Sequence, residues 1–178
     1  DNIATNIPPY FFYDVQGHIF SDISSKDRFS FSYYTGIDDI LFDTFGLDGR
    51  WGNNTISGHW RRVFSERLVG NFLVANSKFR TMFGLGGDGG LVNDNIIDDQ
   101  TISGDFSWFK SPNTTVKFGT QHKTLGFEYF SKFQDSVAFR IKNAPVELGS
   151  YLKMKYSLND LLILEPGVRI NYYNVFPD

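Results

Sequence analysis

Hydrophobic and polar residues alternate along most of this chain. Near the C-terminus, for example, Val168 and Ile170 fall on one parity and Arg169 falls on the other. A two-residue period is typical of a β-strand with one apolar and one polar face, whereas an amphipathic helix repeats every 3.6 residues. Eight segments carry the two-residue pattern and are predicted to be strands: 9–21, 28–36, 55–63, 68–79, 101–109, 114–124, 151–157 and 161–173.

The connections between these segments have two lengths. Short polar turns are centred near positions 24, 65, 112 and 159. Long connectors cover residues 38–54, 80–97 and 125–145. In an up-and-down antiparallel sheet, this alternation puts every short turn at one end and every long loop at the other. The pattern therefore predicts one all-β unit over residues 1–178, an antiparallel up-and-down sheet of about eight strands without an internal domain boundary.

Three features favour lipid, rather than a protein core, on the apolar faces. Most of the segments exceed the about 5–6 residues usual in globular proteins and suit the about 9–11 residues of a tilted membrane-spanning strand. Short turns at one end and long loops at the other are the outer-membrane pattern. Aromatic residues also mark both ends of the apolar faces, as interfacial girdles do: Phe29, Trp60, Trp108 and Tyr156 near the short turns, and Tyr13, Tyr33 and Tyr172 towards the other end.

A transmembrane β-barrel in the bacterial outer membrane is therefore expected, with the apolar parity against outer-membrane lipid and the polar parity towards the lumen. A closed sheet is required because every backbone N–H and C=O must be paired inside hydrocarbon. The segment 68–79 is apolar on both parities for several residues, so the alternation leaves open which of its sides faces lipid.

Composition and charge exclude several classes of protein. Aromatic residues make up 17% of the 178 residues, which suits pleated, half-buried surfaces. The formal net charge is −3, and the isoelectric point near 5.6 provides no electrostatic basis for binding nucleic acid. The chain has no cysteine, which excludes disulfides and cysteine-based metal sites.

Four stretches, taken in chain order, resemble barrel hairpins of TonB-dependent outer-membrane receptors. The last one matches the E-x-x-x-Y … L-x-L-x-P-G-[LV]-R-x-x-Y hairpin, and the first one matches an F-Y-D-x-Q-x strand followed by an S-x-S-x-Y-x-G strand. The four stretches read FYDVQGHIFSDISSKDRFSFSYYTGIDD, SGHWRRVFSERLVGNFLVANSKF, TVKFGTQH and VELGSYLKMKYSLNDLLILEPGVRINYY.

The resemblance implies a mid-barrel portion, without the plug, of a barrel of about 22 strands. It implies energised import of a scarce ligand, a siderophore, cobalamin, glycan or peptide, and leaves open which one. The implied partners are the remaining barrel and plug of the same receptor or another chain that completes the barrel, the TonB complex, and a surface lipoprotein.

Two other interpretations stay open from the sequence. One is a complete eight-stranded outer-membrane barrel with a structural or adhesion role. The other is a soluble β-barrel that binds an apolar ligand. No arrangement of residues supports an enzyme, and no cofactor is predicted.

Two connectors contain candidate binding residues. The Gly- and acid-rich connector offers oxygen ligands for calcium at Asp88, Asp94, Asp98 and Asp99, although their spacing does not match an EF-hand loop and a surface loop is the competing interpretation. The third connector holds aromatic side chains of the kind that dominate binding surfaces, and either contacts a ligand or partner or folds on itself. These aromatic residues are Phe127, Tyr129, Phe130, Phe133 and Phe139.

The three histidines, His18, His59 and His122, lie in separate predicted strands. They would form a metal site only if those strands were neighbours, and otherwise they are isolated polar side chains.

Overall fold

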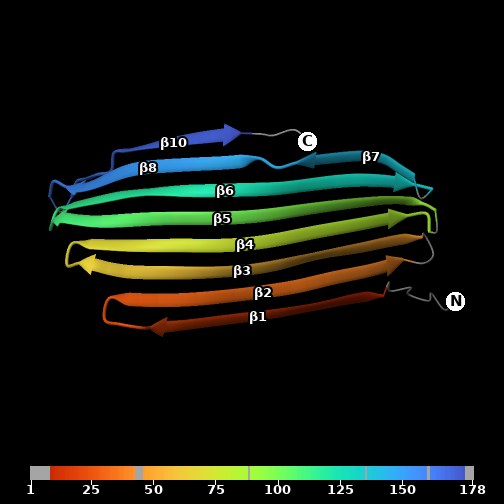
Figure 1. The fold of residues 1–178 in the computed structure, drawn as a ribbon, viewed down its shortest axis with the longest axis horizontal. Coiled ribbons are helices and arrows are strands. Elements are labelled where there is room, and N and C mark those ends of the chain that lie inside the picture. The colour runs from red at the N-terminus through yellow and green to blue at the C-terminus, as the bar shows by residue number, and fades with distance from the viewer. Residues whose placement is uncertain (1–8, 43–45, 88, 135, 160, 175–178) are drawn as a thin grey trace.

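The computed structural model describes residues 9–42, 46–87, 89–134, 136–159 and 161–174. All of its regular elements are β-strands, and they lie side by side in a single layer (Figure 1). The strands are β1 (Tyr10–Asp22), β2 (Asp27–Phe42), β3 (Leu47–Ser65), β4 (Leu68–Leu85), β5 (Leu91–Ser111), β6 (Thr114–Phe133), β7 (Ser136–Asn143), β8 (Val146–Ser157), β9 (Ile163–Leu164) and β10 (Gly167–Asn174).

Each strand pairs antiparallel with its neighbour, which confirms the predicted up-and-down sheet. The main order is β1-β2-β3-β4-β5-β6-β8-β10, so the sheet has eight positions across its width. Strands β7 and β8 share one position, because both pair with β6 and they follow one another along it (Figure 1). The sheet does not close on itself, and β1 and β10 are its edges.

The predicted long loops are wrong, because most of their residues continue the strands. Strand β2 runs to Phe42 and β3 begins at Leu47, and β4 and β5 are separated only by residues 86–90. Their backbones pair in unbroken register up to Leu85 and Leu91. In β3, β4 and β6 these extensions also alternate, but most of their apolar side chains lie on the opposite face from those near the short turns, and this reversal hides the pattern.

The ten strands exceed the predicted eight for two reasons. Strand β7 lies within the segment 125–145 that was expected to be a loop. Pro166 splits the last predicted strand into β9 and β10, because proline has no N–H for the ladder. The carbonyl of Pro166 still accepts a bond from the Met154 N–H at 2.9 Å, which keeps the chain beside β8.

The register assigns every side chain to one of two faces. One face, called here the Trp60 face, carries an aromatic row across β2 to β6 near the end that bears the short turns, called here the turn end. Ring centroids are 5.6 Å apart from Phe29 to Trp60, 4.9 Å from Trp60 to Phe72, 5.5 Å from Phe72 to Phe106, and 5.2 Å from Phe106 to Phe118. In β4 the even-numbered residues share this face.

No hydrophobic side chain is buried in the described part of the chain. Phe118, Met154 and Ile170, from three neighbouring strands, share the Trp60 face, and 39%, 39% and 72% of their surfaces are exposed. The apolar surface is therefore not the core of a compact body formed by this sheet alone.

Candidate ligand-facing surface

The two faces of the sheet exchange polarity along the strands. Near the turn end, the face opposite the Trp60 face is polar: Lys153 pairs with Glu165 at 2.5 Å, and the Tyr151 hydroxyl donates to Asp105 at 2.7 Å. In the other half of the sheet, called here the far end, the same face is aromatic. We name this opposite face the Tyr129 face, after a residue in its aromatic half.

The far end of the Tyr129 face carries an aromatic patch drawn from β3, β4, β6 and β7. Cross-strand pairs place Phe79, Ile97 and Phe127 in one row, and they place Trp51 and Tyr129 in the next row. Tyr129 and Phe139 pack edge to face, with ring centroids 6.1 Å apart. The aromatic patch consists of Trp51, Phe79, Phe83, Phe127, Tyr129, Phe133 and Phe139.

On strands β3 to β7, amides and a hydroxyl provide the polarity of the aromatic patch, and at its border Asp38 of β2 lies opposite Trp51. The Tyr129 hydroxyl donates to Asn93 Oδ1 at 2.9 Å. The Oδ1 atom of Asn95, in the same row as Tyr129, is buried and has no hydrogen-bond partner among the described residues. Aromatic rings with unpaired amide groups stack on and hydrogen-bond to uncharged ligands.

Four of the five aromatic residues predicted for a binding loop, Phe127, Tyr129, Phe133 and Phe139, belong to the aromatic patch, on strands rather than on a loop. The fifth, Phe130, lies on the other face, where Lys132 and Arg140 approach its ring at 5.4 Å and 5.7 Å.

Sequence reasoning missed Trp51, Phe79 and Phe83 as members of the patch. The signal was present as odd-numbered alternation from Phe79 to Phe83. It was hidden because the preceding half of β4 places Phe72 and Val74, which are even-numbered, on the Trp60 face.

Three of the predicted calcium ligands lie along β5, and Asp88 lies outside the described residues. Asp94 and Asp98 are on the Trp60 face, and Asp99 is on the other. Each has a partner: Asp94 binds Arg80, Asp98 accepts from Asn76 at 3.1 Å, and Asp99 pairs with Lys123 at 2.7 Å. Within the described ranges, no three His, Cys, Asp or Glu side chains are grouped to hold a metal ion.

The histidines are not brought together. His18 and His59 share the Tyr129 face but are separated by β2, and His122 lies on the Trp60 face. His18 Nδ1 is 2.8 Å from Ser32 Oγ, so its partner is a hydroxyl of the neighbouring strand.

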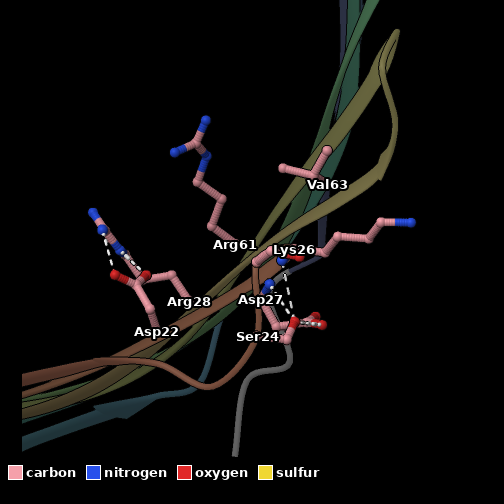
Figure 2. Close-up of a pocket in the computed structure, with 8 residues that line it drawn as sticks. Asp22, Ser24, Lys26, Asp27, Arg28, Arg61 and Val63 are labelled. Carbon is pink, nitrogen blue, oxygen red and sulfur yellow. Dashed lines mark hydrogen bonds and ion pairs between the residues drawn. The ribbon is translucent and has the colours of Figure 1, made fainter.

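A shallow hollow of about 340 Å³ opens beside the turn between β1 and β2. Figure 2 shows Asp22 and Arg28 directed at one another, with Arg61 on the same side. Arg28 Nε donates to Asp22 at 2.6 Å, and this bond lowers the pKa of the Asp22 carboxyl. The Ser24 hydroxyl, at 2.9 Å, and then the Trp60 indole N–H, at 3.0 Å, lower the pKa of Asp27. These contacts hold the turn and provide no group for chemistry.

Acidification is expected to loosen this turn. Because the folded-state pKa of Asp27 is lowered, its contribution to stability is present above the unfolded-state value near ~3.9 and is lost as pH falls through the folded-state value. Trp60 donates to this carboxylate, so its emission should shift below pH ~3.9. Asp27→Asn should remove that step from a fluorescence titration, and identical titrations of the two proteins would contradict the assignment.

No helix in the described ranges is long and apolar enough to cross a membrane. Comparisons of the chain with protein-family models, with curated proteins and with solved structures found no match.

Proposed function

We propose that this chain forms part of the wall of a transport barrel in the bacterial outer membrane, of the TonB-dependent receptor type. The turn half of the Trp60 face contacts lipid, and the Tyr129 face lines the lumen. The far end projects beyond the membrane on the outside. The barrel imports a scarce ligand of the siderophore, cobalamin, glycan or peptide kind.

The observation that carries the proposal is an apolar band that nothing in the described chain covers. The aromatic row from Phe29 to Phe118 lies in this band. At its turn-end border the Trp60 indole N–H donates to Asp27, and Arg62 lies 5.8 Å from the Trp60 ring. An amphipathic ring with its polar edge directed away from an apolar band is typical of a membrane interface.

The open edges support the completion of the barrel by further strands. Strands β1 and β10 present unpaired backbone groups along one side, and these groups are costly in hydrocarbon. The remaining barrel of the same receptor, or another chain, supplies the missing strands in this proposal. Together they form a barrel of about 22 strands that surrounds a plug.

The far end supplies the surface for ligand capture. Above the membrane the aromatic patch faces the axis of the barrel, where a ligand enters. On strands β3 to β7, the rows that contain Trp51, Phe79 and Phe83 hold no charged residue. The patch therefore suits a ligand with uncharged, planar or apolar parts. Docking of a surface lipoprotein at the far end, and of the TonB complex at the opposite side of the membrane, completes the proposed pathway.

Single cysteines test this arrangement, since the chain contains none of its own. Val74 lies in the proposed lipid band, and the adjacent Ala75 lies on the proposed lumen side. Ala75→Cys is therefore the matched control for Val74→Cys. We expect a charged thiol reagent to label Ala75→Cys and leave Val74→Cys unmodified. In intact cells an impermeant maleimide should label Leu85→Cys at the far end, and it should label Glu66→Cys in a short turn only after the outer membrane is opened. Equal labelling of Val74→Cys and Ala75→Cys would refute the proposal.

A further inference from the structure

Three hollows follow one another along strands β2, β3 and β4 on the Trp60 face, and together they are called here the groove. Its two parts differ in chemistry, and they follow one another along the strands. The inference drawn from it rests on the proposed function, because it requires the Trp60 face to contact a bilayer.

The turn-end part of the groove is apolar. It consists of two adjoining hollows of about 490 Å³ and 530 Å³ that share Phe31, Gly58 and Val74. In the register, Gly58 of β3 lies between Phe31 of β2 and Val74 of β4, and it forms the floor of the apolar part of the groove. A Cβ atom added at Gly58 would meet no atom within 4 Å, so the floor is open space rather than a tight backbone contact.

The far-end part of the groove is cationic. Its hollow of about 540 Å³ is lined on this face by Ile37, Met82 and three basic side chains, Arg50, Lys78 and Arg80. The register puts Lys78 opposite Asn54 and puts Arg80 opposite Gly52, so the cations follow directly after the apolar part.

The three cations are not equally neutralised. Arg50 pairs with Asp39, and Arg80 pairs with Asp94, but 60% and 58% of the two arginine side chains remain exposed. Lys78 has no ion-pair or hydrogen-bond partner in the described part of the chain. Its cross-strand neighbour Asp98 accepts a hydrogen bond from Asn76 and forms no ion pair with Lys78, so the Lys78 ammonium group makes no direct contact with a carboxylate.

We propose that this groove binds one phosphate-bearing lipid of the outer leaflet. The phosphate lies against Lys78, Arg50 and Arg80, and an acyl chain lies along Gly58 towards the aromatic row. Lys78 is four residues from Val74, about 13 Å along the strand. One leaflet of a hydrocarbon core of ~30 Å spans about 15 Å, so the cations lie at headgroup level when Val74 lies near the centre of the bilayer. An anionic head with an apolar tail is complementary to both parts of the groove.

Quenching of Trp60, which lines the apolar part, tests the proposal. The full chain, with Trp51→Phe and Trp108→Phe, is reconstituted in bilayers that contain either brominated phosphatidylglycerol or brominated phosphatidylcholine. We expect both lipids to quench Trp60, and the anionic lipid to be preferred at low mole fraction. A surface cation contributes about 1 kcal/mol to binding anionic lipid, which corresponds to about fivefold, so Lys78→Gln should lower the preference about fivefold.

Two further variants separate the parts of the groove. Gly58→Leu should fill the floor and remove the preference while bulk lipid still quenches Trp60. Lys117→Gln, on the Tyr129 face, is the matched control and should leave the preference unchanged. An excess of inorganic phosphate should not remove the preference, and removal would show a site for free phosphate ions and overturn the proposal.

A failure of the lipid site and a failure of the proposed barrel wall give different results in this experiment. Equal quenching by the two brominated lipids, or a preference that survives both Lys78→Gln and Gly58→Leu, would overturn the lipid site while leaving the barrel wall intact. Absence of quenching by either lipid would instead overturn the proposed function.

Discussion

Arginine in place of Val168 or Ile102 is expected to lower the free energy of unfolding in lipid bilayers by about 2–4 kcal/mol. Both side chains lie in the apolar band of the Trp60 face, and 59% and 58% of their surfaces are exposed. A guanidinium at these positions would have to leave water for hydrocarbon without a partner, whereas valine and isoleucine gain from that environment. Denaturant titration of the reconstituted protein, followed by tryptophan fluorescence, measures the difference.

The matched control for Ile102→Arg is Ser103→Arg, one residue further along β5 and on the polar Tyr129 face. In the proposed barrel the new guanidinium faces a wet lumen, so we expect a change within about 0.5 kcal/mol, as for other surface substitutions. Equal losses at positions 102 and 103 would show that both faces are in the same environment, and the assignment of the Trp60 face to lipid would then be wrong.

Replacing Arg80 by methionine is expected to cost about 3 kcal/mol. Arg80 Nε donates to Asp94 Oδ1 at 3.0 Å, and only 2% of the Asp94 side chain is exposed. Without the guanidinium, the Asp94 carboxylate is left buried and unpaired, which is the costly way to break an ion pair. Because the Arg80 side chain is itself largely exposed, the cost should lie at the low end of the range for buried pairs. Chemical denaturation measures it.

Two variants check the cause of the Arg80 effect. Arg50→Met breaks a similar pair on the same face, but 30% of its partner Asp39 is exposed, so a loss of at most about 1 kcal/mol is expected. The double variant Arg80→Met with Asp94→Leu should be more stable than Arg80→Met alone, since no charge is then left buried. A double variant as unstable as the single one would show that the lost packing of the arginine, and not the orphaned carboxylate, is responsible.

The alternation within each strand and the predicted short turns were accessible from the sequence because both are local. Alternation of Val168, Arg169 and Ile170 specifies opposite sides of a pleated strand wherever that strand is placed. The turn between β5 and β6 at Pro112 and Asn113 follows from residues that favour turn conformations. Val168 and Ile170 share the Trp60 face of β10, and Arg169 lies on the other face, as this alternation predicted.

The strands of the far end could not be predicted from the sequence. Alternation shows that successive side chains point to opposite faces of a strand, but it does not show what each face contacts. Along β4, Phe72 and Val74 are apolar on one face, and Phe79 and Phe83 are apolar on the other. When the apolar residues change from even to odd positions within one strand, the two-residue pattern is interrupted, and the segment is mistaken for a loop. Only the paired backbones of β4 and β5 show that the strands continue through the reversal.

The sequence alone determined that this chain forms antiparallel strands with one apolar and one polar side, since side-chain direction is set residue by residue. The tertiary structure alone decided which side chains meet. The aromatic patch joins Trp51 to Tyr129, and the groove joins Gly58 to Lys78, from strands that are neighbours only through the cross-strand register. That register depends on the hydrogen bonding of whole strands, and no single segment of the chain contains it.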